Sequence, residues 1–206
     1  MIKLVIGNRN YSSWSLRPWL ALKQSGLPFE ESVIRLREVG TRAEIFKYSP
    51  SGKVPCLIDG ETIVWESLAI CEYLAEAVPS LWPADRRRRA EARAISAEMH
   101  SGFGALRQSL PMEIDASKPY VERRAEVRAD IARIVAIWQS CRERFAVGGP
   151  FLFGEFSIAD AMFAPVVWRF ITYAVELPAE SRAWVETMTA LPAMQEWRAN
   201  ALEEVR

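Results

Sequence analysis

Serine hydroxyls cluster in residues 11–17, directly after the first apolar run of the chain, in the order Tyr-Ser-Ser-Trp-Ser-Leu-Arg. We predict a strand-to-helix junction here. A helix N-terminus offers unpaired backbone N–H groups and positive potential, so a hydroxyl there can help to stabilise a bound thiolate. The alternative is that Ser12, Ser13 or Ser15 only caps the helix. This segment alone does not decide between the two.

A Val-Pro pair at positions 54 and 55 precedes a predicted strand. Proline cannot donate to a strand ladder, so it belongs where a strand starts. A cis Val54–Pro55 bond would expose the peptide groups of Val54 to an extended, peptide-like ligand. Only about 5–6% of X–Pro bonds are cis, and the sequence does not establish one. Cys56 follows directly, and we predict it to be a buried strand residue.

Glu66 and Ser67 lie between a predicted strand and the helix that follows it. The Ser67 hydroxyl and backbone N–H can bind a carboxylate, while Glu66 can accept from an ammonium group. Capping is again the alternative, because serine caps helices and the helix dipole favours an acidic side chain. The three segments are more informative together, since each lies at a strand end, where ligands gather in α/β proteins.

A fourth segment, Ser157-Ile158-Ala159-Asp160, opens the most apolar predicted helix. A serine with an acidic residue three positions later is typical of a capping box. We interpret this segment as structural. Its role would be to start a buried helix whose first N–H groups are out of reach of water.

The elements that must position these residues change in kind along the chain. The first third predicts strands and helices in the order strand 2–6, helix 15–25 with Pro18 in its first turn, strand 29–36, a loop or short helix in 40–48, strand 54–58, a turn at Asp59-Gly60, strand 62–65 and helix 67–77. This order is βα, then β with a possible short helix, then a β-hairpin and a helix.

The rest of the chain predicts helices alone. They are Arg86 to Arg107, Lys118 to Phe145, Ser157 to Tyr173, 181–190 and 193–204. One apolar stripe at helical spacing marks the second of them: Val127, Ile131, Ile134, Trp138, Cys141 and Phe145. The third is so apolar that it should be central. The predicted fold class is α/β plus all-α, with a small α/β domain at 1–78 and an all-helical domain at 85–206.

Composition excludes several classes of function. The chain of 206 residues balances 26 Lys+Arg against 26 Asp+Glu, which argues against a nucleic-acid partner. Its single histidine, His100, nearly excludes histidine-based metal sites and triads. Three cysteines indicate free thiols, not a disulfide framework. No run approaches the ~20 apolar residues of a spanning helix, and the first apolar run is too short for a signal peptide. We expect a cytoplasmic protein without a membrane partner.

The four segments, in this order, resemble the cytosolic glutathione transferase superfamily over the whole chain. The resemblance implies a thioredoxin-like N-terminal domain, βαβαββα, and an all-helical C-terminal domain. In that family the proline before the third strand is cis, and the residue before it pairs with the cysteinyl backbone of glutathione. The Glu/Gln-Ser pair holds the γ-glutamyl end. Carried over, these residues are Val54, Pro55, Glu66 and Ser67, with Lys53 near the glycine end.

Ser12-Ser13-Trp14-Ser15 then occupies the place of the Cys-x-x-Cys of thioredoxin-like redox proteins. Serine at both cysteine positions disfavours thiol–disulfide chemistry. The run resembles the serine-type transferases, including the zeta and tau classes, in which Ser12 matches the activating serine and Ser13 is the alternative one residue along. Zeta members have a cysteine where this chain has Trp14, which weakens a maleylacetoacetate-isomerase assignment.

The resemblance implies a mechanism in which the Ser12 hydroxyl donates to the glutathione sulfur and favours the thiolate. That thiolate would attack a small electrophile in a neighbouring apolar pocket. We expect Trp14 and also His100, Phe103 and Arg107 at this pocket, the last three because i, i+3 and i+7 share one face of the predicted helix. For His100 an interhelical hydrogen bond is the alternative.

The expected function is therefore that of a glutathione S-transferase active in detoxification. It would be homodimeric, with glutathione as co-substrate and no metal. Two alternatives stay open: a zeta-like glutathione-dependent isomerase, and a non-catalytic binding module of the same fold. The retention of Ser12, Glu66 and Ser67 favours a functional glutathione site over the module.

Overall fold

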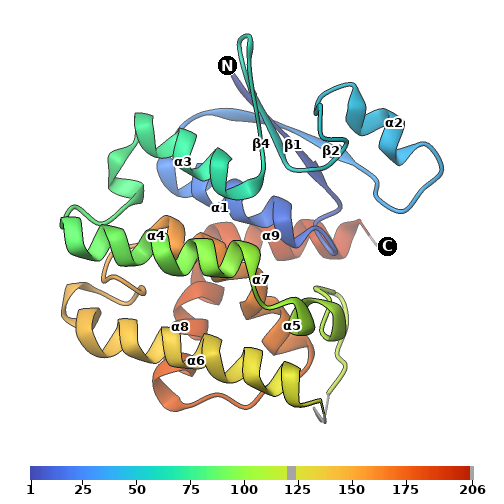
Figure 1. Ribbon diagram of the computed structural model, residues 1–206. Coiled ribbons are helices and arrows are strands. Elements are labelled where there is room, and N and C mark those ends of the chain that lie inside the picture. Colours follow the sequence, from blue (N-terminus) through green and yellow to red (C-terminus); the bar gives the residue numbers. More distant parts are fainter. Residues whose placement is uncertain (120–123, 205–206) are drawn as a thin grey trace.

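The computed structural model describes residues 1–119 and 124–204. A sheet-containing part is followed by a helical part (Figure 1). The first part consists of β1 (Ile2–Gly7), α1 (Ser13–Ser25), β2 (Phe29–Ile34), α2 (Thr41–Phe46), β3 (Cys56–Asp59), β4 (Thr62–Trp65) and α3 (Ser67–Ala77). The second part consists of α4 (Arg86–Ser101), α5 (Gly104–Ser109), α6 (Ala125–Phe145), α7 (Ile158–Thr172), α8 (Ala179–Ala190) and α9 (Pro192–Glu203).

The four strands form one mixed sheet in the order β2-β1-β3-β4. β1 runs parallel to β2 and antiparallel to β3, with Leu4 opposite Leu57. β3 and β4 form the predicted hairpin, and Gly60 takes the left-handed conformation (φ 59°) that its turn requires. This order of strands and helices confirms the predicted thioredoxin-like part.

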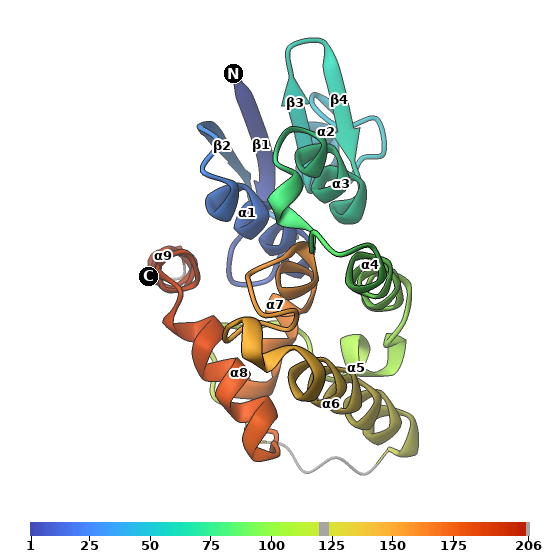
Figure 2. The same ribbon diagram turned by 90° about the vertical axis from the view of Figure 1, so that its left-hand side faces the viewer.

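Alternating apolar residues of β1 face opposite sides of this sheet. Leu4 and Ile6 belong to the main core with α1 and α3, whereas Val5 packs in a separate small cluster with Ile45 of α2 and Cys56 of β3. The sheet is therefore covered on both faces. α1 and α3 lie between it and the helical part (Figure 2).

The apolar helix α7 lies at the centre of the helical part, as predicted. Each of its residues except Ile171 is buried, and one continuous apolar core runs from α1 and α3 through α7 to α9. The predicted stripe of α6 faces this core, with Trp138 and Cys141 buried and Phe145 partly buried. Among the described residues, no helix is both long enough and apolar enough to cross a membrane.

The first helix begins two residues earlier than predicted. α1 begins at Ser13, so Pro18 lies inside the helix and not in its first turn. Strand limits also differ from the prediction: β2 ends at Ile34 rather than Leu36, and β3 begins at Cys56 rather than Val54. Helix α6 begins at Ala125, and Lys118, where the sequence placed its start, is not helical. The intervening 120–123 lie outside the described residues.

The largest error of prediction is the helix expected to run from Arg86 to Arg107. α4 ends at Ser101, and a separate helix, α5, begins at Gly104. Between them, Phe103 adopts a left-handed conformation with φ 60°. The glycines on either side, Gly102 and Gly104, lower the helix propensity at this point, so the chain turns instead of continuing.

Candidate functional site

A cavity of about 240 Å³ opens beside the start of β3 and the junction of β4 with α3. Its lining residues are Trp14, Ser51, Lys53, Val54, Pro55, Glu66 and Ser67. The structure therefore brings together all five residues that the sequence proposed for glutathione, with Trp14 from α1 as a further wall. Ser51 was not predicted.

Glu66 and Ser67 form the N-terminus of α3 at this cavity. Glu66 has φ 70°, an uncommon conformation for a residue with a side chain. Ser67 is buried, and its hydroxyl finds no hydrogen-bond partner in the described chain. A buried hydroxyl normally has a partner, so a free one beside unpaired helix N–H groups suits a bound carboxylate.

The Val54–Pro55 peptide bond is cis, as the family resemblance implies. The ladder with β1 starts only at Cys56, so Val54 lies just before the paired strand, in the cavity wall. Lys53 is exposed, and its backbone N–H donates to Ser51 Oγ at 3.2 Å. This arrangement offers peptide groups and one cation to an extended ligand.

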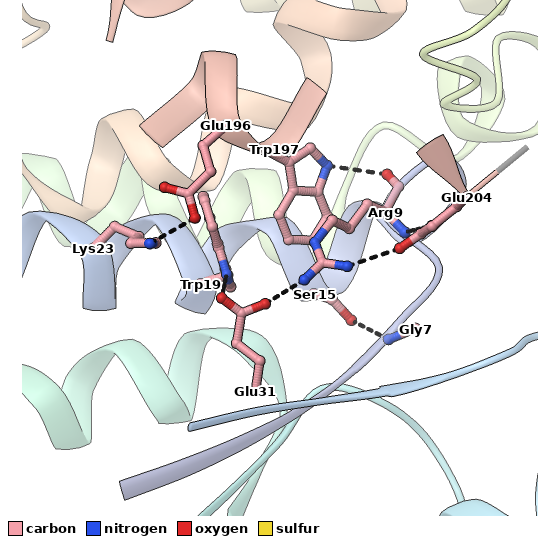
Figure 3. Close-up of polar contacts among 9 residues, drawn as sticks. All are labelled: Gly7, Arg9, Ser15, Trp19, Lys23, Glu31, Glu196, Trp197 and Glu204. Carbon is pink, nitrogen blue, oxygen red and sulfur yellow. Dashed lines mark hydrogen bonds and ion pairs between the residues drawn. The ribbon is translucent and has the colours of Figure 1, made fainter. Parts of the chain in front are cut away.

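Ser12 occupies the N-cap position of α1 without a capping hydrogen bond from its side chain, and it is almost fully buried. Its hydroxyl donates to Ser15 Oγ at 2.7 Å, and that oxygen also accepts the Gly7 N–H at 3.1 Å (Figure 3 shows the second bond). The two hydroxyls thus tie the end of β1 to the first turn of α1. Ser12 is not among the residues that line the cavity.

Ser13 has a different environment from Ser12. Its Oγ accepts from Nη2 of Arg169, on α7, at 3.2 Å. The same guanidinium donates to the carbonyl of Leu110, and burial lowers the pKa of Arg169 to about 10. Ser13 is therefore held by the helical part, whereas the Ser12 hydroxyl pairs within α1.

Trp14 connects the cavity with two cations, Arg17 of α1 and Arg107 of α5. The guanidinium carbons of Arg17 and Arg107 lie 4.4 and 4.6 Å from the centre of its ring. Arg17 is fully buried; Nε donates to the Met162 carbonyl, while both terminal nitrogens lack a partner in the described chain. Burial, followed by the charges of Arg107 and Arg169, lowers the pKa of Arg17.

His100 borders the cavity from α4. Its ring meets Trp14 edge-on at 5.3 Å, and Nε2 lies 3.6 Å from Glu66 Oε2. Nδ1 is buried without a partner in the described chain. Burial, and next the charge of Arg17, lowers the pKa of His100, against the opposing effect of Glu66. His100 therefore links the two parts beside the cavity.

The predicted shared face of His100, Phe103 and Arg107 is wrong, because the helix that carried it ends at Ser101. Phe103 is buried in the turn between α4 and α5. Arg107 reaches back to the end of α4, where Nε donates to the Gly102 carbonyl at 2.9 Å and Nη2 to that of Met99. A cation is favoured at a helix C-terminus, so Arg107 caps α4 in addition to contacting Trp14.

The segment at Ser157 forms the predicted capping box at the start of α7. The Ser157 N–H donates to Asp160 Oδ2 at 2.9 Å, and Asp160 Oδ1 accepts from the Leu152 N–H and from Trp184 Nε1. The interpretation of this segment as structural therefore agrees with its bonding.

The three cysteines are free and buried. Cys56 lies in β3, as predicted, and burial raises the pKa of Cys71 and Cys141 to about 12. Thiols with such pKa values are poor nucleophiles at neutral pH. Among the described residues, no group of three or more His, Cys, Asp and Glu side chains could hold a metal ion.

Sequence reasoning missed Ser51, Arg17 and Arg169 and gave Ser15 no role beyond capping. The spacing of Ser12 and Ser15 was a usable signal, because residues three apart share a helix face. Arg17 also stood on the apolar side of its predicted helix, between Leu16 and Leu20. Arg169 gave no such signal, since its contact with Ser13 joins residues 156 positions apart.

The structure defines a class of fold: a thioredoxin-like N-terminal part with a cis-proline beside its cavity, followed by an all-helical C-terminal part. Comparison with known proteins identifies the family. The model of the glutathione S-transferase N-terminal domain matches residues 11–77, and that of the C-terminal domain matches residues 121–200.

Individual relatives agree with these matches. The maleylacetoacetate isomerase of Mus musculus is 33% identical over 82% of this chain and 78% of its own length. Glutathione S-transferase GstB of Escherichia coli is 26% identical over 93% and 96%. A glutathione transferase homologue from Burkholderia, solved with bound glutathione, superposes with a TM-score of 0.73 at 24% identity, covering 98% of both chains. The chain belongs to the glutathione S-transferase superfamily.

Proposed function

We propose that this protein is a glutathione transferase that converts the thiol of bound glutathione into a thiolate for attack on a small electrophile. The observation that carries the proposal is the unpartnered, buried Ser67 hydroxyl in the cavity that gathers Lys53, Val54 and Glu66. Such a hydroxyl at a helix N-terminus is suited to a carboxylate.

Glutathione would lie along the cavity in an extended conformation. Its γ-glutamyl carboxylate would accept from the Ser67 hydroxyl and backbone N–H, while its ammonium group would pair with Glu66. The peptide groups of Val54 would pair with the cysteinyl backbone, as a neighbouring strand would. Lys53 would meet the glycine carboxylate.

Thiol activation is assigned to Ser12, with Ser13 as the alternative. A hydroxyl can rotate, so the Ser12–Ser15 bond can reverse its direction. Ser15 would then donate to Ser12, and Ser12 would donate to the sulfur. Such a chain strengthens the final hydrogen bond, and the positive end of α1 favours the thiolate further. Arg169 donates to Ser13 Oγ and leaves the Ser13 proton free to donate, so Ser13 stays the alternative.

The electrophile would bind between the two parts of the chain, near Trp14, His100, Phe103 and Arg107. Residues 1–78 would then bind glutathione, and residues 85–206 would supply the second half of the pocket. The guanidinium groups of Arg17 and Arg107 against Trp14 support an electrophile that carries or develops negative charge.

A glutathione-dependent isomerase is the second candidate, because the mouse maleylacetoacetate isomerase shares 33% identity over most of the chain. In that reaction the thiolate would add to a double bond and leave again after rotation. Trp14 stands where zeta-class enzymes have cysteine, so conjugation is the first candidate.

We also propose a cytoplasmic homodimer with a role in detoxification. Exposed apolar side chains on α2 and on the edge strand β4 support the dimer: Phe46, Ile63 and Trp65 are 49, 44 and 43% exposed. Multi-angle light scattering on the purified chain gives its mass in solution, and the mass of a single chain would exclude the dimer.

Retention on immobilised glutathione, followed by conjugation of chlorodinitrobenzene, tests the enzyme proposal. Wild type should be retained and turn over, and Ser12→Ala should be retained with at least tenfold lower activity, as expected for the loss of one hydrogen bond to an anion. Ser13→Ala is the matched control. Wild type that is not retained would contradict the proposal, and retention without turnover would favour a binding module. Maleylacetoacetate turnover in the same preparation identifies the isomerase.

A further inference from the structure

The last helix holds the backbone of the loop that leads to Ser12. This loop, residues 8–12, joins β1 to α1. Within it, the Arg9 N–H donates to Glu204 Oε2 at 2.7 Å, and the Arg9 carbonyl accepts from Trp197 Nε1 at 3.0 Å (Figure 3). Both peptide groups of Arg9 are thus bound by side chains of α9 or the residue after it, far along the chain.

The side chain of Arg9 adds a second set of contacts at the same place. Its guanidinium donates to Glu204 Oε1 at 2.8 Å and to Glu31 of β2, and it lies 5.8 Å from the ring centre of Trp197. The three charged side chains are between 12 and 23% exposed. Partly buried, charge-assisted hydrogen bonds fix geometry better than surface ion pairs do.

The position of Arg9 bears directly on Ser12, three residues further on. The Asn8 carbonyl accepts the Tyr11 and Ser12 N–H groups at 3.2 and 2.9 Å, which closes the loop into a tight turn. Ser12 then bonds to Ser15, and Ser15 to Gly7 at the other end of the loop. A displacement of Arg9 within so short a turn must therefore move Ser12.

We propose that Arg9, Trp197 and Glu204 form a positioning clamp, through which α9 sets the place of the Ser12 hydroxyl against the glutathione sulfur. The proposal rests on the proposed function, since it concerns the same thiol. These residues are not catalytic, because they act only through the loop. A misplacement of about 1 Å at a reacting group can cost up to a hundredfold in rate, so even a small loop shift has a measurable effect.

The same helix supplies a matched control. Glu196 pairs with Lys23 of α1 at 2.7 Å, an ion pair that joins α9 to the N-terminal part without touching the loop (Figure 3). Asn10 holds the loop independently, because its Oδ1 accepts from the Ile114 and Asp115 N–H groups. Loss of the clamp should therefore leave a folded protein whose loop stays attached at Asn10 and shifts around Arg9.

The test compares Glu204→Gln and Arg9→Lys with Glu196→Gln. Hydrogen exchange should be faster in the loop amides of both clamp variants than in wild type, without ligand. The pKa of the bound glutathione thiol, followed by thiolate absorbance, should rise, and kcat at neutral pH should fall about three- to tenfold with an unchanged KM for glutathione. Glu196→Gln should match wild type in all three measurements. Arg9→Lys retains the positive charge and serves if Glu204→Gln does not fold.

The inference is overturned if the clamp variants and Glu196→Gln lose thermal stability alike while loop exchange, thiol pKa and kcat stay at wild-type values. α9 would then be a packing helix only. A wild type that binds glutathione without lowering its thiol pKa would refute the proposed activation, and the inference with it. If wild type and the clamp variants lower the thiol pKa of glutathione equally, the inference is refuted and the proposed activation stands.

Discussion

Two helix N-termini in this protein each combine a serine with an acidic residue, and their bonding differs. α7 begins with Ser157 and Asp160, and α3 begins with Glu66 and Ser67. At α7, the carboxylate accepts from two backbone N–H groups, a tryptophan and the serine hydroxyl. At α3, the Ser67 hydroxyl is buried without a partner in the described chain.

Backbone conformation separates the two ends as well. Ser157 is extended, with φ −141°, whereas Glu66 is left-handed. A left-handed residue with a side chain is strained, and strain of this kind gathers at functional sites. The comparison suggests that satisfied groups at a helix start stabilise the fold, whereas a hydroxyl without a partner binds a ligand where it also lines a cavity, as Ser67 does.

The largest effect is expected at the satisfied end. Asp160→Ala should lower the free energy of unfolding by about 3–5 kcal/mol, because several buried donors would lose the carboxylate that accepts from them. Urea unfolding measures the loss. Asp85→Ala, at the exposed N-cap of α4, is the control and should cost much less. An equal loss of unfolding free energy in the two variants would show that the capping box of α7 stabilises the fold no more than the exposed N-cap of α4 does.

The next effect is on binding alone. Ser67→Ala should weaken glutathione binding about tenfold, the value of one hydrogen bond to a charged group, and leave the melting temperature unchanged because no protein partner is lost. Isothermal titration calorimetry gives the affinity. Ser181, in α8, also has a buried hydroxyl without a partner in the described chain, so Ser181→Ala is the matched control. Unchanged affinity in Ser67→Ala would refute the γ-glutamyl assignment.

Strain at the α3 end predicts opposite changes in stability and binding. Glu66→Gly should raise the free energy of unfolding by up to about 1 kcal/mol, since relief of the left-handed strain outweighs the entropy cost of glycine. It should also weaken glutathione binding by removing the carboxylate. Ala174 also has a positive φ (51°) and does not line the cavity, so Ala174→Gly relieves strain away from it. That control should gain stability and keep the wild-type affinity for glutathione. If Glu66→Gly also kept the wild-type affinity, the role of the Glu66 carboxylate in binding would be contradicted.

The smallest effect concerns pH. The pKa of His100 is lowered from 6.5 in the fold, so the unfolded chain takes up this proton more readily than the folded one. The contribution of His100 to stability is therefore full above pH 6.5 and lost as the pH falls. Wild type should lose slightly more stability than His100→Gln between neutral and mildly acidic pH, measured by urea unfolding. A parallel pH dependence in the two proteins would contradict the lowered pKa.

Much of the fold could be predicted because its signals are local. The alternation around Leu4, the turn at Asp59-Gly60 and the apolar run of α7 each lie within one segment. The end of α4 was not predicted, although Gly102 and Gly104 flank Phe103, because the spacing of His100, Phe103 and Arg107 fits a continuous helix. The end of α4 is also stabilised by Arg107, which donates to the Gly102 carbonyl. This contact forms only in the folded chain.

The residues of the site also divide into those with a local sequence signal and those defined by long-range contacts. Lys53, Val54, Glu66 and Ser67 belong to short motifs, and the structure places them around one cavity. The contact between Trp197 and Arg9 spans 188 residues, and neither residue belongs to a recognisable motif. Contacts of this kind depend on how the helical part packs against the sheet, which no local pattern encodes.

The most direct test of the central claim is the pKa of the glutathione thiol on the protein, read from thiolate absorbance. In wild type and in Ser13→Ala we expect a pKa about two units below the free value of about 8.5. In Ser12→Ala, with glutathione still bound, it should return close to the free value. A thiol pKa that stays low in Ser12→Ala, or that is not lowered in wild type, would contradict the account.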